Sequence, residues 1–120
     1  MEILDKSLLE LTGYRMRRST SSALARMQDV FAKFGLRRTT FSALALVVDN
    51  PGLRQSQLAE ALAIERPNLV RIVDELEKAG LLQRKAVAND RRAYALKATH
   101  AGSALLERAM RAVRDFDQRL

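Results

Sequence analysis

The apolar positions near the middle of the chain follow the period of an α-helix in two successive segments. In residues 55–64, Leu58, Ala59 and Leu62 fall on one helical face. In residues 66–79 the apolar residues recur at i, i+3, i+4 and i+7, at Leu69, Ile72, Val73 and Leu76. Only Glu65 separates the two segments. The pattern therefore predicts a helix-turn-helix.

The ends of the second predicted helix are marked by two residues with strong backbone preferences. Pro67 suits a first helical turn, and Gly80 suits the left-handed position just beyond the last turn. The outer face of the first half of this helix carries Arg66, Pro67, Asn68, Val70 and Arg71. In a DNA-recognition helix such positions meet base edges, because Asn pairs with adenine, Arg with guanine or a phosphate, and Val with a thymine methyl. The alternative is an ordinary solvated helix face.

A short hairpin with a basic tip is predicted directly after this helix. Residues 81–86 and 93–98 alternate loosely, as strands do, and Asn89 and Asp90 supply the turn chemistry between them. The segment carries one acid and five basic residues: Arg84, Lys85, Arg91, Arg92 and Lys97. Such a tip is suited to lie along phosphates and to insert an arginine into a minor groove, whose narrow form concentrates negative potential. The alternative is a loop charged only for solubility.

Four segments together resemble the MarR family of winged-helix regulators. They are residues 51–59, residues 69–84, the hairpin tip at 89–92, and 99–102 at the start of the last predicted helix. The similarity is close from about residue 30 to residue 106. The resemblance implies a homodimer that binds a pseudo-palindromic operator in double-stranded DNA. It also implies repression of nearby genes and release by a small anionic aromatic effector.

The resemblance assigns roles to individual residues. The recognition-helix contacts fall on the five outward residues named above. The contacts of the wing, which is the hairpin, fall on Arg91, Arg92 and Arg84. Contacts with the DNA backbone fall on Arg37, Arg38 and Thr40, at the start of a helix that Thr39 or Thr40 is expected to cap.

The chain departs from the family pattern at three positions. Arg54 stands where a Thr or Ser usually caps the first helix of the motif, so that cap is absent or comes from elsewhere, at about 1 kcal/mol. Ala63 replaces the usual turn glycine, and a positive φ there costs on the order of 1 kcal/mol. Ala98 replaces a typical leucine, which thins the packing under the hairpin.

The composition favours a nucleic-acid partner. Twenty-one basic residues against fourteen acidic ones give a net charge of +7, which suits a polyanion because neutralising phosphates releases counterions. The chain has no cysteine, which excludes disulfides, thiolate catalysis and cysteine-based sensing. No catalytic motif, phosphate loop or metal-ligand spacing is present, and His100 is expected to face solvent in a first helical turn. We therefore expect no enzymatic activity, no cofactor and no metal.

Apolar seams near both ends of the chain predict a dimer. Toward the C-terminus the seam consists of Leu106, Ala109, Val113, Phe116 and Leu120. Toward the N-terminus it consists of Leu24, Met27, Phe31 and Phe34, preceded by a patch at Leu4, Leu8 and Leu11. Because a small DNA-binding domain cannot easily cover both apolar stripes, we expect the terminal helices to interleave with those of a second copy. In the alternative, these helices fold back on their own domain.

Arg15 and Arg18 lie between the seams, with Arg17 beside them, and are the candidate effector site. They are suited to an acidic partner, to phosphates or to an effector carboxylate. The alternative is that these arginines only form the solvent-exposed face of a helix.

The expected fold is mainly α (α+β): a winged helix-turn-helix with long N- and C-terminal helices that form a dimerisation region. The expected units are an N-terminal dimerisation region at 1–35, a DNA-binding domain at 36–98 and a C-terminal helix at 99–120. No apolar run approaches the roughly 18 residues of a membrane span and no secretory pattern is present, so a cytoplasmic protein is expected. A winged helix that docks a protein without operator binding is the alternative function. Leu120 stands inside a helical pattern, which leaves open a compact family member or an incomplete chain.

Overall fold

The computed structural model describes residues 25–88 and 90–118, with the backbone alone at 90–92 and 117–118. A helical segment at 25–32 comes first. It is followed by α3 (Arg38–Asp49), β1 (Leu53–Arg54), α4 (Gln55–Leu62), α5 (Arg66–Lys78), β2 (Leu82–Val87), β3 (Asp90–Ala98) and α6 (His100–Gln118). Several residues with expected roles lie outside the described part of the chain: Leu4, Leu8, Leu11, Arg15, Arg18, Leu24 and Leu120.

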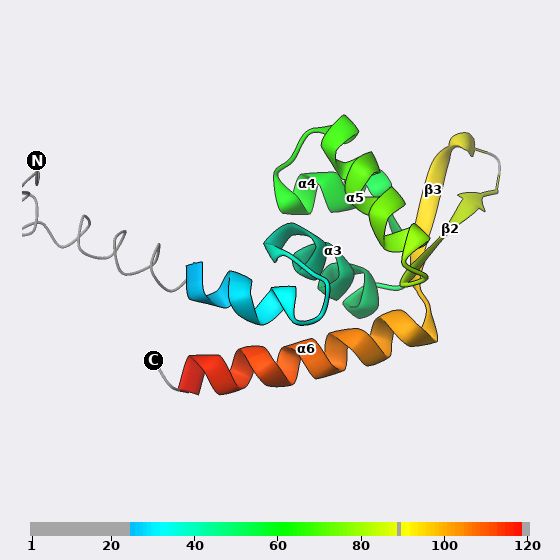
Figure 1. Cartoon of the computed structure of the whole chain (residues 1–120). Helices are drawn as coiled ribbons and strands as arrows, with labels where there is room; N and C mark the ends of the chain where they lie inside the picture. The colour runs from blue at the N-terminus through cyan, green and yellow to red at the C-terminus, as the bar shows by residue number, and fades with distance from the viewer. Residues whose placement is uncertain (1–24, 89, 119–120) are drawn as a thin grey trace, which may run out of the picture.

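The helices form layers around α3. Figure 1 shows α3 between α6 on one side and the pair α4 and α5 on the other, with the β2–β3 hairpin at one end of the molecule. The sheet is small and antiparallel, with strand order β1-β3-β2. A mainly helical fold with this sheet confirms the predicted fold class.

Helices α4 and α5 confirm the predicted helix-turn-helix. Pro67 lies in the first turn of α5, and Gly80 beyond its last turn has a φ of +76°. The turn between the two helices passes through Ala63, which is left-handed with φ 53° and ψ 44°. The N–H groups of Ala63 and Ile64 donate to carbonyl oxygens at the end of α4, both at 3.1 Å. The glycine-like turn is therefore formed with alanine.

The first turns of α3 and α4 are closed by side chains from within the helices. Before α4, the Arg54 N–H donates to Gln57 Oε1 at 2.9 Å. Before α3, the Arg37 N–H donates to Thr40 Oγ1 at 2.9 Å, and that hydroxyl donates to the Arg37 carbonyl at 3.1 Å. Both are half of a capping box, which satisfies one backbone N–H ahead of each helix. Thr40, one of the two residues expected to cap α3, thus does so from within the first turn, while the N-cap position itself is Arg37.

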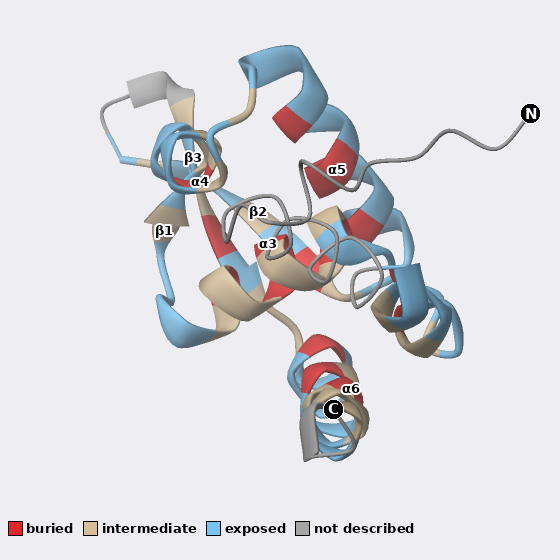
Figure 2. Cartoon of the chain, turned by 90° about the vertical axis from the view of Figure 1, so that its left-hand side faces the viewer, coloured by how far each residue is buried: buried red, intermediate tan, exposed pale blue. Residues whose placement is uncertain are grey.

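Helix α3 supplies the centre of the hydrophobic core. Its residues Ala43, Leu44 and Val47 are fully buried. The surrounding helices and strands contribute Leu58, Leu69, Ile72, Val73, Leu76, Leu82 and Leu96. All four apolar residues expected on the inner face of α5 are therefore buried, and Figure 2 shows the buried residues on the faces that meet inside the molecule.

Part of the predicted dimer seams belongs to the core of this chain. Phe31 is 3% exposed and stacks on Phe41 with ring centroids 4.6 Å apart. On α6, Leu106 is 7% exposed and Ala109 is fully buried. Leu106 and Ala109 therefore pack on their own domain, as the alternative had it for these two residues, whereas dimerisation through the rest of the seam stays a prediction.

The first turn of α6 is fixed to the junction of α5 and β2. The Thr99 hydroxyl accepts the N–H of Gly102 at 3.0 Å and donates to the Gly80 carbonyl at 2.6 Å. The Thr99 N–H donates to the Leu81 carbonyl at 3.0 Å. Gly102 is buried, and a Cβ there would overlap the Leu81 carbonyl oxygen. This contact explains why the segment from Thr99 to Gly102 needs a hydroxyl at its start and a glycine at its end.

Candidate nucleic-acid interface

The first half of α5 presents a polar face to solvent. All five residues predicted to face outward are exposed: Arg66, Pro67, Asn68, Val70 and Arg71. Val70 is 37% exposed, which is unusual for a large apolar side chain in this structure. The opposite face of the same helix is locked in the core, so the backbone of this surface is held firmly. The predicted exposure is confirmed, whereas contact of these residues with DNA stays a prediction.

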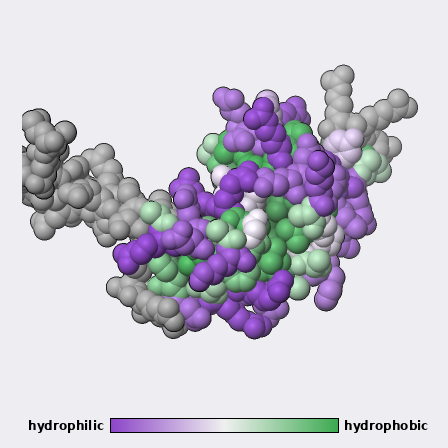
Figure 3. Space-filling model, in the orientation of Figure 1, coloured by the Kyte–Doolittle hydropathy of each residue, from purple (hydrophilic) through white to green (hydrophobic). Residues whose placement is uncertain are grey.

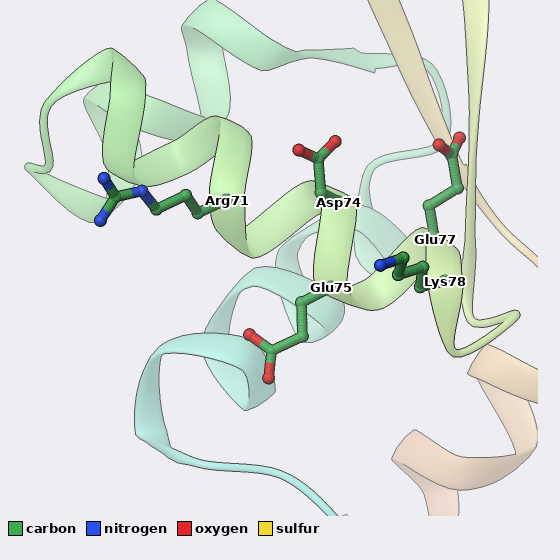
Figure 4. A pocket seen from close by; sticks show the side chains of 5 residues that line it. All are labelled: Arg71, Asp74, Glu75, Glu77 and Lys78. Atoms are coloured by element: carbon green, nitrogen blue, oxygen red, sulfur yellow. The ribbon is translucent and has the colours of Figure 1, made fainter.

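The second half of α5 changes its charge. Asp74, Glu75, Glu77 and Lys78 follow Arg71 and line with it an open hollow of about 550 Å³. Figure 4 shows the carboxylates of Asp74 and Glu77 on one side of the helix and that of Glu75 on the other. Figure 3 shows mostly hydrophilic residues over the upper and outer parts of this face of the molecule, with apolar residues gathered toward the middle of the view. The first half of α5 is therefore basic, whereas the second half carries carboxylates that need basic partners.

Glu75 is paired with Arg37 at the start of α3. Arg37 Nη1 donates to both carboxylate oxygens, at 2.6 and 2.7 Å, with both side chains about half exposed. Arg37 therefore already has a carboxylate partner at the place where a phosphate contact was predicted. Arg38 is exposed.

The predicted contact of Thr40 with the DNA backbone is wrong. Its residue is 2% exposed, and its hydroxyl is used by the Arg37 main chain. A buried hydroxyl with its donor and acceptor capacity already engaged has no route to a phosphate.

Arg84 lies at the base of the hairpin and does not belong to its tip. It pairs with Leu96 in the sheet, and its side chain, 18% exposed, turns toward α5. There it binds Asp74 at 2.5 Å and Glu77 at 3.0 Å. Its predicted role as a wing contact with DNA is therefore wrong in geometry, because its guanidinium faces carboxylates of its own chain. Sequence spacing gave no signal for these pairs, since neither partner shares an element with Arg84.

The hairpin tip is shorter than predicted. Strand β3 begins at Asp90, which pairs with Val87, so Arg91 and Arg92 belong to the strand and not to the turn. The next pair along is Ala86 with Tyr94, so residues 91–93 are additional on β3. A bulge of this kind bends and twists the strand that carries it. Arg91 and Arg92 therefore lie on the part of β3 that has no pairing partner on β2.

Neither a metal site nor a membrane span occurs among the described residues. The His, Asp and Glu side chains in residues 25–88 and 93–116 form no group of three that could hold a metal ion. None of the helices in the described part of the chain has both the length and the apolar character needed to span a bilayer.

Comparison with known sequences identifies the family. The model of the MarR family matches residues 34–93, which includes the helix-turn-helix and reaches into β3. A Thauera aromatica protein assigned as a transcriptional regulator of the hcr operon is 32% identical over 118 residues, which is 98% of this chain and 71% of that protein. The chain belongs to the MarR family of transcriptional regulators.

Solved structures of MarR-family repressors share the fold. The transcriptional repressor CouR bound to a 23-mer DNA duplex matches with a TM-score of 0.85 and 36% identity, over 95% of this chain and 80% of that one. CouR bound to p-coumaroyl-CoA matches with a TM-score of 0.79 and 34% identity, over 94% and 78% of the two chains. These relatives are regulators and not enzymes. The winged helix-turn-helix described above is thus the DNA-binding architecture of this family.

Proposed function

We propose that this chain is a sequence-specific operator-binding repressor of nearby genes that acts as a homodimer. The observation that carries the proposal is the first half of α5: polar, exposed, and mounted on a helix whose other face is fully buried. The similarity to CouR bound to a DNA duplex supports the same use of this surface. The protein acts in this proposal by binding alone, in the cytoplasm, and catalyses no reaction.

The proposed base contacts come from α5. Asn68 is suited to adenine and Arg71 to guanine, while Val70 offers an apolar surface to a thymine methyl. Arg66 and Pro67 lie in the first turn, which is the part of a recognition helix that enters deepest. Specificity is thus assigned to about one and a half turns of helix.

The proposed contacts with the sugar-phosphate backbone lie on either side of α5. Arg38 at the start of α3 is exposed toward solvent, and Arg91 and Arg92 lie on the bulged part of β3. In this arrangement Arg37 reaches a phosphate only by leaving Glu75. The wing arginines are assigned to the minor groove beside the one that α5 reads.

The proposed dimer uses residues 1–35 and 99–120, with residues 36–98 as the reading unit. On α6, Phe116 is half buried within one chain and is not among the described residues packed on the core, which supports a partner at that end of the helix. Val113, one turn earlier, packs against the core of its own chain. A homodimer would carry twice the +7 charge of one chain and so a strong attraction for a polyanion.

The proposed effector is an anionic aromatic compound, of which an aromatic acyl-CoA thioester is the best-supported kind. The support is the similarity to CouR bound to p-coumaroyl-CoA. The excess of basic residues in this chain suits the phosphates of such a ligand. Arg15 and Arg18 remain the candidate residues for it.

Selection of bound duplexes from a random DNA pool tests the function. We expect a two-fold related sequence with half-sites about one helical turn apart, bound much more tightly than random DNA. Addition of p-coumaroyl-CoA to the complex with this selected operator is expected to release it. A pool without any enriched sequence would contradict operator binding and favour a protein-docking winged helix. Enrichment of a sequence without release by p-coumaroyl-CoA would contradict the proposed acyl-CoA effector and leave operator binding supported.

A further inference from the structure

Arg84 joins three elements of the winged helix. Its Nε donates to Gln55 Oε1 in the first turn of α4 at 2.8 Å. Its Nη1 donates to Glu77 at 3.0 Å and its Nη2 to Asp74 at 2.5 Å, both on α5. The Arg84 backbone N–H adds a bond to the second oxygen of Glu77 at 3.2 Å. One residue of β2 is thus bound to the start of α4 and to two turns of α5.

The chemistry of this joint is specific to arginine. A guanidinium holds five N–H donors in one rigid plane, and here they point to three side-chain acceptors and to the Val70 carbonyl oxygen at 3.4 Å, on two helices. The side chain is 18% exposed, while Asp74 and Glu77 are 56% and 42% exposed. Water therefore competes less well for the guanidinium than for an ordinary surface ion pair. A lysine at this position keeps the positive charge but cannot reach three acceptors in fixed directions.

The joint lies between the two surfaces that the proposed function uses. Asp74 and Glu77 are on the turns of α5 that directly follow Arg71, and β2 is the strand that leads into the hairpin tip. The angle between α5 and the hairpin therefore depends on how Arg84 is held. A change in that angle moves Asn68 and Arg71 relative to the wing.

We infer that Arg84 is a positioning residue that sets the orientation of α5 relative to the wing and thereby the selectivity for operator over random DNA. This inference rests on the proposed function. It assigns no DNA contact to Arg84. Nonspecific attraction, which depends on total charge, does not require this orientation, whereas the matching of side chains to base edges does.

The test compares unaltered protein with Arg84→Lys, which preserves charge. The dissociation constants for the selected operator and for a random duplex of equal length are measured for both proteins. We expect random-duplex binding to stay the same, and operator affinity to fall about tenfold or more, as for loss of one bidentate base contact. The control is Arg111→Lys on α6, where the guanidinium bonds Glu107 in an exposed i,i+4 pair, and we expect no change in selectivity.

A distance measurement tests the same inference without DNA. The chain has no cysteine, so Glu65→Cys at the start of α5 and Ala88→Cys near the hairpin tip allow two spin labels to be placed specifically. Dilution with unlabelled protein removes distances between copies. We expect one narrow distance distribution with Arg84 intact and a broader or shifted one in the Arg84→Lys variant, with both proteins folded by circular dichroism.

The outcomes separate the inference from the proposed function. If the unaltered protein binds operator and random duplex equally well, the proposed operator binding is contradicted. The label distances still show whether Arg84 fixes the orientation of α5 relative to the hairpin. A narrow, unchanged distribution in Arg84→Lys would overturn the positioning role. So would a broadened distribution with intact selectivity, because the orientation would then not be used in reading DNA. If Arg84→Lys does not fold, Gln55→Ala, which removes one of the three side-chain acceptors, replaces it in both measurements.

Discussion

Ala63 holds a backbone conformation that alanine adopts at a cost. Its φ of 53° and ψ of 44° are left-handed, which strains a residue with a Cβ by on the order of 1 kcal/mol and does not strain glycine. We expect Ala63→Gly to raise the free energy of unfolding by about 0.5 kcal/mol, because the greater freedom of glycine in the unfolded chain offsets part of the gain. Urea unfolding followed by circular dichroism measures it. Ala61→Gly, in the exposed interior of α4, is the control and should destabilise by about 1 kcal/mol; equal losses in both variants would contradict the strain.

Arg71 lies in the middle of α5 and is exposed. If it pairs with a base edge, Arg71→Ala should weaken operator binding at least about tenfold, or about 1.4 kcal/mol, and weaken random-duplex binding much less. Fluorescence anisotropy with labelled duplexes gives both constants. Lys33→Ala removes one positive charge from an exposed turn and serves as the control. Equal losses for the two variants would mean that Arg71 acts through charge alone.

Single residues were predictable from the sequence where the helical period alone decides their placement. The exposed face of α5 and its buried partners follow from a 3.6-residue repeat, so Asn68 and Leu69 were both placed correctly. Arg84 and Thr40 were not, because their environments depend on partners in other elements or on which residue begins a helix. The period of a helix predicts which face a side chain lies on, but it does not predict which residue of another element that side chain contacts.

The wing is an element whose contribution to binding can be measured as a whole. Arg91 and Arg92 lie on the bulged strand, and each contact with a phosphate contributes about 0.9 to the slope of log affinity against log salt. Because a homodimer carries two wings, we expect the double change of both residues to Ala to reduce the magnitude of that slope by about 4 and to weaken binding to all duplexes. Lys33→Ala combined with Arg114→Ala is the charge-matched control at exposed positions. A slope that does not differ from the control would mean that the wing does not contact DNA.

The junction between α6 and the reading unit depends on Gly102. A Cβ at this position would overlap the Leu81 carbonyl oxygen, and backbone has no flexible end that can give way. We expect Gly102→Ala to lower the free energy of unfolding by about 1–3 kcal/mol, as overpacking does in tight cores, despite the better helix propensity of alanine. Thermal and urea unfolding measure the loss. Ser103→Ala, at the next and exposed position, should be nearly neutral. A stabilised Gly102→Ala protein would show that the helix can move away from Leu81 freely.

Elements were predictable from the sequence when they were long enough to show a period. Helices α4 and α5 carry one, and their bounds fall inside the predicted segments. The two-residue strand β1 is too short to show alternation, and it exists because its pairing with β3 at Leu96 satisfies the backbone. The start of β3 was also missed, since the strand begins at Asp90 through its pair with Val87, and no alternation marks the unpaired residues 91–93 that follow.

The two terminal seams show how the whole molecule constrains what a sequence pattern can mean. Each is an apolar stripe at helical spacing, which by itself predicts a partner helix. Within the chain, however, Phe31 and Ala109 are buried against the domain itself. The periodicity of a helix is the same whether its partner is another element of the chain or a second copy. Only three-dimensional packing separates the residues that are satisfied within one chain from those that are not.

On α6, the residues that pack on their own chain end before Phe116. Val113 packs against the core, whereas Phe116, one turn further, is half buried and is not among the described residues that do so. If a second copy covers this end, the protein sediments as a dimer at micromolar concentration, and Phe116→Ser raises the dimer dissociation constant by about tenfold or more, because a large apolar side chain is lost from the interface. Phe34→Ser, which alters a residue packed on the chain's own core, is the contrasting control: it should lower the unfolding midpoint. Sedimentation of the unaltered protein at the 13.5 kDa of one chain would contradict the assembly, and with it the pairing of two recognition helices on one operator.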